Sequence, residues 1–216
     1  MAPVGRRTFL LTAASIASGS LLAGSAVPPI AVAQAVPGST RYGVKALFFD
    51  VFGTVVDWRS SLIFELSRFG QEKGIVGDWP LLVDEWRAAY YPSMDRVRRG
   101  EIPWTNLDAL HRQSLEALVA NLQISGVTTE VLGELTDAWC RLRPWPDVVE
   151  GMQRLSARYL LGPLSNANVA LMVRLRKFAG LPWDFVFGAD LWQHYKPDPE
   201  AYRGTCKLLG LSLIHI

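Results

Sequence analysis

Residues Lys45 to Arg59 read KALFFDVFGTVVDWR, and this stretch decides the fold. Its apolar run, Ala46 to Phe49, is typical of a parallel strand covered on both faces, and the run ends abruptly at Asp50. In open α/β sheets the ligand crevice lies outside the carboxyl ends of the strands, so we expect Asp50 to lie in a site. The Gly53-Thr54 turn lets backbone N–H groups approach a substrate, and an Asp placed here can act as a covalent nucleophile.

The segment from Asp50 to Asp57, DVFGTVVD, resembles the first motif of the haloacid dehalogenase superfamily. The resemblance implies that Asp50 attacks the substrate and that the Thr54 side chain supports it. Phosphatases of this superfamily carry a second Asp at the position of Phe52, where it protonates the leaving group and helps to place magnesium. A phenyl ring can do neither. With Phe52 before Gly-Thr, the chain is similar to the type II 2-haloacid dehalogenases, which hydrolyse a carbon–halogen bond without a metal.

A second motif follows the next expected strand, where Leu164 to Asn168 reads LSNAN. A hydroxyl and free N–H groups at a strand end that opens a helix suit an anion. The resemblance implies that Ser165 and the following N–H groups, beginning with Asn166, hold the substrate carboxylate. Taken alone, Ser165 would be interpreted as a helix cap.

The third motif is His194 to Tyr202, HYKPDPEAY. A lysine beside a carboxylate favours its charged form, so we expect Lys196 to keep the nucleophile ionised. Asp198 and Tyr202 fall at positions that the dehalogenases use near the site, so Tyr202 is a further candidate for substrate binding. His194 has no partner in the sequence and is interpreted as a structural or surface residue, as is His111.

The halide cradle of this family centres on an arginine of the cap. Arg96 is the nearest candidate, with Arg87 and Arg98 behind it, although the spacing from Trp86 does not match the family cleanly. Phe52 and other aromatic side chains could form an apolar wall around the substrate. At helical spacing, however, most aromatics are simply core; the other candidates are Trp58, Tyr90, Tyr91 and Trp104.

The period of the apolar residues changes after the first motif. Four groups at helical spacing fill the space before the next expected strand, and Gly and Pro residues, Pro92 among them, separate the groups. By the resemblance this insertion is a helical cap, residues 59–143. Helices then alternate with strands expected at Tyr159 to Leu164 and at Phe185 to Phe187. The sequence therefore predicts an α/β fold with a doubly wound parallel sheet, whose incomplete Rossmann-like core comprises residues 45–58 and 144–210. Pro163 conflicts with a central strand, because it lacks an N–H.

Composition limits the class of protein. The chain has 216 residues, of which 50% are apolar, and a formal charge of +2, which suits one globular domain with additions. Nothing in this balance favours nucleic acid, and the basic cluster Arg96, Arg98 and Arg99 is interpreted as a solvated helix face. The two cysteines, Cys140 and Cys206, are far apart and predict buried thiols, not a disulfide framework.

Residues 1–35 are expected to lie outside the fold. Arg6-Arg7 opens a segment without charge from Thr8 to Thr40 that offers small-residue cleavage sites, and it resembles a twin-arginine export signal. The partner would be the twin-arginine translocase, and the location periplasmic or secreted. A membrane anchor is the alternative, but Ser and Gly residues and Pro28-Pro29 weaken it. Residues 36–44 are then a linker.

The chain is expected to be cut short. Members of the family continue past the lysine motif to an acidic fourth motif and further strands. The last six residues, 211–216, read LSLIHI. A transposon end that is used in preparing sequencing libraries would encode these six residues. Because the missing strands pair beside the first strand, we expect the 216-residue chain to be poorly soluble and inactive. Sequencing the source gene beyond codon 210 tests this.

Together the motifs predict a hydrolase that converts small 2-haloalkanoic acids to 2-hydroxy acids through an aspartyl ester, with no cofactor and no metal. One alternative is a phosphatase of the same superfamily, which Phe52 opposes. Another is an exported binding protein that keeps the crevice without turnover. Dehalogenases of this type are often homodimers, so a homodimer is expected for the full-length protein.

Overall fold

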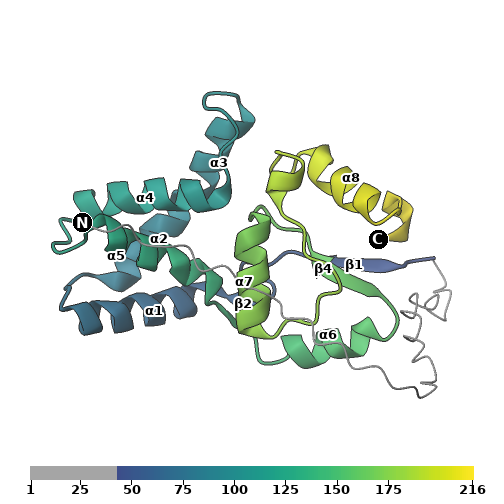
Figure 1. Ribbon diagram of the computed structural model, residues 1–216, viewed down its shortest axis with the longest axis horizontal. Coiled ribbons are helices and arrows are strands. Elements are labelled where there is room, and N and C mark those ends of the chain that lie inside the picture. Colours follow the sequence, from purple (N-terminus) through teal and green to yellow (C-terminus); the bar gives the residue numbers. More distant parts are fainter. Residues whose placement is uncertain (1–42) are drawn as a thin grey trace, which may run out of the picture. The chain divides into compact units, whose positions relative to one another are not determined.

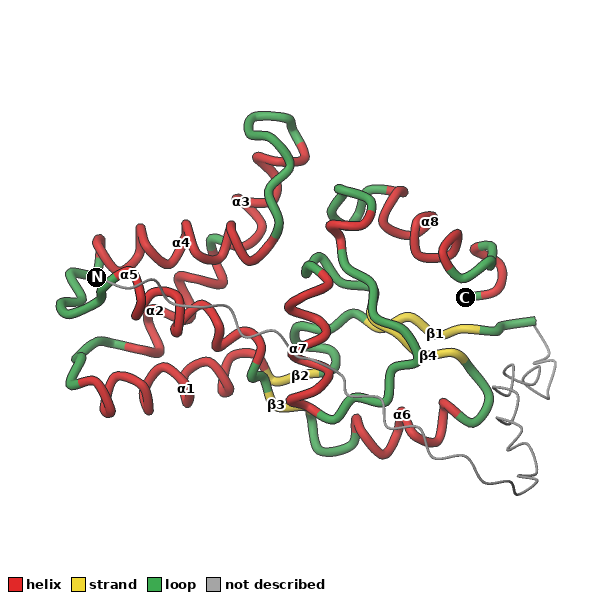
Figure 2. Tube along the Cα trace, viewed as in Figure 1, coloured by secondary structure: helices red, strands yellow, loops and turns green. Residues whose placement is uncertain are grey.

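The computed structural model describes residues 43–216, and Figure 1 shows the arrangement of their elements. The predicted export signal and residues 36–42 of the predicted linker lie outside the described residues. Helices make up most of the regular structure, with two short pairs of strands (Figure 2). No helix of residues 43–216 is both long and apolar enough to cross a membrane.

The parallel sheet consists of β1 (Ala46–Phe49) and β4 (Leu160–Pro163), paired with Ala46 opposite Leu160. The apolar run predicted the bounds of β1 correctly, and β4 is one residue shorter at each end than predicted. A second, antiparallel pair closes the base of the helical insertion: β2 (Val56–Asp57) and β3 (Arg143–Pro144). Helices precede and follow β4, namely α6 (Val148–Ser156) and α7 (Val169–Ala179), so the α/β alternation is confirmed.

The predicted third strand, Phe185 to Phe187, is wrong. Alternate residues of β4 face β1, since Leu160 N donates to Lys45 O at 2.9 Å and Leu164 N to Phe49 O at 2.8 Å. The other edge of β4 carries Leu161, whose N–H is 2.8 Å from the Asp184 carboxylate and whose carbonyl accepts from Asp184 N at 2.9 Å.

The next residue on that edge is Pro163, which has no N–H, so a ladder cannot continue past Asp184. The ring of Phe185 instead packs where a Cβ on Gly162 would stand. The conflict noted in the sequence is therefore explained: Pro163 does not interrupt the pairing with β1, because its missing N–H faces the other way. Within residues 43–216 the parallel sheet has two strands.

Five helices and a short 3-10 helix form the insertion, which we call the cap. Four helices were expected, and the difference is α3, which contains Pro92 in its first turn, where an N–H has no partner within the helix. Side-chain oxygens of Asp57, Asp78, Asn106 and Thr128 accept backbone N–H groups at the starts of the other four helices. The elements are α1 (Trp58–Lys73), α2 (Trp79–Ala88), α3 (Tyr90–Arg98), α4 (Leu107–Asn121), α5 (Thr129–Thr136) and η1 (Asp137–Cys140).

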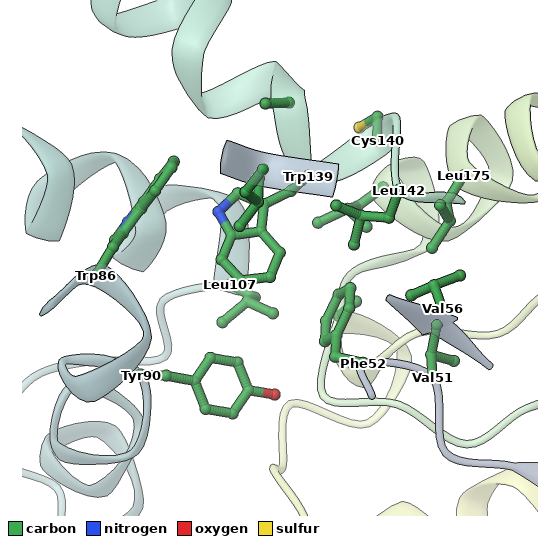
Figure 3. Close-up of a cluster of buried hydrophobic side chains, with 14 of the residues drawn as sticks. Val51, Phe52, Val56, Trp86, Tyr90, Leu107, Trp139, Cys140, Leu142 and Leu175 are labelled. Carbon is green, nitrogen blue, oxygen red and sulfur yellow. The ribbon is translucent and has the colours of Figure 1, made fainter. Parts of the chain in front are cut away.

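One apolar core joins the cap to the first motif. Trp139 of η1 lies between Trp86 of α2 and Phe52 (Figure 3), with ring centroids 5.5 Å from Trp86 and 5.2 Å from Phe52. The Trp86 indole N–H donates to His111 O at 2.9 Å. Phe52 is therefore packed into the core on one side while it borders the site on the other. Cys140 and Cys206 are both free and buried, as predicted.

Candidate active site

The carboxylate of Asp50 stands directly after β1, and both of its oxygens are held. Lys196 Nζ lies 2.7 Å from Oδ1, and Thr54 Oγ1 donates to Oδ2 at 3.0 Å. The Asp50 side chain is still 49% exposed, whereas that of Lys196 is 20% exposed. The carboxylate is thus oriented by a cation and a hydroxyl, yet it remains open to a substrate.

Lys196 is fixed by more than its ion pair with Asp50. Its Nζ also donates to Leu164 O at 2.7 Å, at the carboxyl end of β4, and its backbone N donates to Asn166 Oδ1 at 2.6 Å. The third motif is thereby tied to the ends of both parallel strands. This is the edge at which the sequence predicted that the three motifs would meet.

A cavity of about 310 Å³ opens beside Asp50. All three motifs and the cap contribute to its lining, so the site is a composite of segments far apart in the chain. At this size it suits a small ligand. The lining residues are Asp50, Phe52, Arg87, Tyr90, Tyr91, Asn166, Lys196, Pro197 and Tyr202.

The second motif contributes differently from what was expected. Asn166 lines the cavity, but Ser165 is buried behind it, and its Oγ accepts from Ala167 N at 3.2 Å. Ser165 does not cap α7 either, because the N-cap residue is Asn168. Its hydroxyl therefore stabilises the turn that presents Asn166 to the cavity.

The cap arginine at the cavity is Arg87, not Arg96. The Arg87 guanidinium lies over the ring of Tyr90, 4.2 Å from its centroid, and its buried Nη1 has no hydrogen-bond partner among residues 43–216. The side chain of Arg96 is 56% exposed and its Nε lies 3.9 Å from Glu101. Arg98 pairs with Asp198.

Helix geometry explains why Arg96 does not line the cavity. Tyr90 and Met94 are the buried residues of α3, and a residue two positions after Met94 lies roughly half a turn away, on the solvent face. Arg87 follows Trp86, which the core holds, and its side chain meets Tyr90 at the i+3 position. The Arg-x-x-Tyr spacing was the signal in the sequence that could have identified Arg87.

Burial and charge set the protonation of two rings of the cap, Tyr90 and His111. Burial raises the pKa of Tyr90 to about 12, although the charge of Arg87 opposes the shift, so Tyr90 is a neutral donor. Burial, followed by the charge of Arg87, lowers the pKa of His111 to about 3. His111 is stacked on Trp139 with ring centroids 4.1 Å apart, in agreement with the structural role predicted for it.

Two residues of the third motif take separate places. Tyr202, on α8 (Pro199–Leu208), lines the cavity. Asp198 is the N-cap residue of α8 and does not line it; its carboxylate binds Arg98 of the cap. Among residues 43–216, no three His, Cys, Asp or Glu side chains are grouped so that they could hold a metal ion.

Comparisons with known proteins agree with the superfamily that the motifs indicated. The family of haloacid dehalogenase-like hydrolases matches residues 44–215. The crystal structure of an L-2-haloacid dehalogenase is 51% identical, with a TM-score of 0.76, over 78% of this chain and 72% of that one.

Two further relatives carry similar names. A defluorinating L-2-haloacid dehalogenase is 41% identical, with a TM-score of 0.75, over 78% of this chain and 70% of the other. The (S)-2-haloacid dehalogenase 4A of Burkholderia cepacia is 26% identical over 180 residues, which are 78% of this chain and 71% of that protein. The predicted fold class, an α/β core with a parallel sheet and a helical cap, is thus confirmed.

Proposed function

We propose, from the premise that this chain belongs to the haloacid dehalogenase-like hydrolases, that it hydrolyses small 2-haloalkanoic acids to 2-hydroxy acids. One observation carries the proposal: Asp50 is held by Lys196 and Thr54 at a small cavity, and Phe52 lines that cavity. Phe52 occupies the position where the phosphatases of the superfamily need a second acid. The names of the similar dehalogenases support the same reaction.

The reaction proceeds in two displacements. Asp50 attacks the substrate carbon next to the carboxylate, a carbon–oxygen bond forms, and the carbon–halogen bond breaks with the electron pair leaving on the halide. Water then attacks the carbonyl carbon of the aspartyl ester, which releases the 2-hydroxy acid and restores Asp50. The net change consumes one water and produces a halide ion and a proton.

Lys196 holds the attacking carboxylate of Asp50 in place, because its ammonium lies 2.7 Å from Oδ1. Two of its three N–H donors are used on Asp50 and Leu164 O, so Lys196 is assigned to the nucleophile and not to the substrate carboxylate. The substrate carboxylate is assigned to Asn166 and Tyr202, which line the same cavity as Asp50.

Arg87 is assigned to the departing halide. Its guanidinium carries a positive charge, lines the cavity, and has a buried N–H with no acceptor in the described part of the chain. An anion beside the guanidinium offsets part of the cost of holding this charge away from water. Since charge develops on the halide as the bond breaks, this contact stabilises the transition state more than the ground state.

Halide release from (S)-2-chloropropionate by the full-length protein tests the proposal. We expect turnover by the wild type and none by Asp50→Asn. A single turnover in ¹⁸O-labelled water should place the label on Asp50 and not on the first product molecule, because the product oxygen comes from the carboxylate. Label in the product alone would mean direct attack by water, and magnesium-dependent release of phosphate from phosphate esters without halide release would favour the phosphatase.

Export through the twin-arginine translocase is proposed from Arg6-Arg7 and the uncharged segment that follows them. Mass spectrometry of the mature protein should find an N-terminus near residue 35. An intact Met1 on membrane-embedded protein would contradict export and support the anchor.

A further inference from the structure

One ion pair, outside the cavity at Asp50, joins the cap to the third motif. Arg98 Nε and Nη2 both donate to Asp198 Oδ1, at 3.0 Å and 2.8 Å. Arg98 is the last residue of α3, and Asp198 is the residue that precedes α8. The bond therefore connects an end of a cap helix directly to the third motif.

Both partners are close to cavity residues along the chain. Tyr90 and Tyr91, which line the cavity, begin the helix that Arg98 ends. Asp198 comes two residues after Lys196, the partner of Asp50, and four residues before Tyr202. Because Tyr90 and Arg98 belong to one helix, a contact at Arg98 constrains the helix that carries Tyr90 relative to the segment that carries Lys196.

A buried contact already anchors the same two segments. The Tyr195 hydroxyl donates to Thr105 O at 2.6 Å, and its ring lies against Trp104 with centroids 4.8 Å apart. This contact uses neither Arg98 nor Asp198, so it remains when the ion pair is removed. Trp104 and Tyr195 line the same cavity as Arg98 and Asp198, so the ion pair is a second contact between the cap and the third motif.

The pair is partly shielded yet reachable by solvent. The side chains of Arg98 and Asp198 are 31% and 22% exposed, and a cavity of about 240 Å³ lies beside them. Arg98 Nη1 also donates to Asp95 at 2.9 Å. His194 Nδ1 lies 3.5 Å from Asp198 and 3.8 Å from Glu200.

From this geometry we infer that Arg98 and Asp198 form a clasp that holds the cap wall of the active site against the third motif. They are positioning residues and touch no reacting atom. The effect expected on dehalogenation rests on the proposed function, whereas the effect on cap mobility does not. A charge-assisted pair with two N–H donors on one carboxylate is stronger than an ordinary surface pair, but its solvent access keeps the effect moderate.

A double-mutant cycle tests the clasp in the full-length protein. Arg98→Gln and Asp198→Asn should each lower kcat/KM for (S)-2-chloropropionate by about three- to tenfold, and the double variant should be no worse than either one, because both remove the same bond. Arg98→Lys should restore part of the loss. Arg99→Gln is the matched control, since Glu101 is the one ion-pair partner of Arg99 among residues 43–216, and it should stay within twofold of wild type.

Hydrogen–deuterium exchange without substrate gives a second readout. Arg98→Gln should speed exchange at backbone amides of residues 90–105 and 193–202 by about threefold or more, and Arg99→Gln should not. If wild type releases no halide but exchange changes in this way, the clasp stands and the proposed function fails. Unchanged exchange, or additive losses of kcat/KM in the double variant, would overturn the clasp.

Discussion

The two walls of the candidate active site are held by different forces. On the strand side, Asp50 and Lys196 are fixed by hydrogen bonds to each other, to the Thr54 hydroxyl and to the backbone oxygen of Leu164 at the end of β4. On the cap side, Arg87 is held by aromatic stacking and has a buried N–H with no acceptor among residues 43–216. The difference teaches that polar bonds orient the side chains on the strand side, whereas packing of aromatic rings orients Arg87 on the cap side.

We expect the largest effect on activity from removing the cation beside Asp50 on the strand side of the site. Lys196→Met removes the cation beside Asp50, and we expect kcat to fall by roughly a thousandfold or more, since the nucleophile loses its charge partner. Steady-state halide release measures this. Lys207→Met, at the last turn of α8, is the control and should retain wild-type rates. A Lys196→Met variant with near-normal kcat would show that the ion pair is structural only.

Loss of an aromatic ring from the core of the cap should lower the stability of the fold. Trp139→Ala removes a ring that is 1% exposed and contacts Phe52, Trp86 and His111. We expect a loss of about 3–5 kcal/mol in the free energy of unfolding, as for other large-to-small core changes. Urea denaturation measures it. Phe178→Ala, whose ring is largely solvent-exposed, should cost far less, and equal losses would contradict the core described here.

A conservative change at Arg87 separates the contribution of its positive charge to kcat/KM from that of its planar guanidinium. Arg87→Lys keeps the positive charge but loses the planar fork that stacks on Tyr90, so we expect kcat/KM to fall by about a hundredfold. Arg96→Lys should change it by less than twofold. Halide release by the two variants decides between the arginines, and the opposite ranking would return the halide site to Arg96.

The smallest effect concerns pH. Because the pKa of His111 is lowered from 6.5 to about 3 in the folded protein, the unfolded chain binds the proton first as pH falls. His111 therefore costs no stability above pH 6.5 and destabilises the fold progressively between pH 6.5 and about 3.

Replacement of His111 by Phe should remove that part of the acid sensitivity. Between pH 7 and pH 5 the free energy of unfolding should fall by about 2 kcal/mol less in the variant than in wild type. This figure assumes a slope of roughly 1.4 kcal/mol per pH unit below pH 6.5. Denaturant midpoints at both pH values measure this. Identical losses in the two proteins would mean that His111 is protonated in the fold.

Sequence and structure place the same residues together on the strand side of the candidate site, whereas on the cap side they differ in which arginine lies at the cavity. Asp50, Lys196, Asn166 and Tyr202 do line one cavity, because short motifs at strand ends inherit their positions from the sheet. The choice among three cap arginines required knowing which face of α3 is buried. The inward place of Ser165 likewise depends on the turn around it, although its residue type suited a ligand.

The chain by itself determined the features that depend on neighbouring residues. The four apolar residues of β1 end at Asp50, and polar residues cap helices at the positions where the apolar period begins. Such features follow from local hydrogen bonding and periodicity, which a sequence displays directly.

Only the tertiary structure decided the features that depend on which surfaces meet. Pro163 blocks a third strand because its missing N–H faces the edge away from β1, and Arg87 reaches the cavity because Trp86 is packed against the cap core. Packing brings together residues far apart in the chain, and the orientation of a side chain within that packing is a property of the whole core.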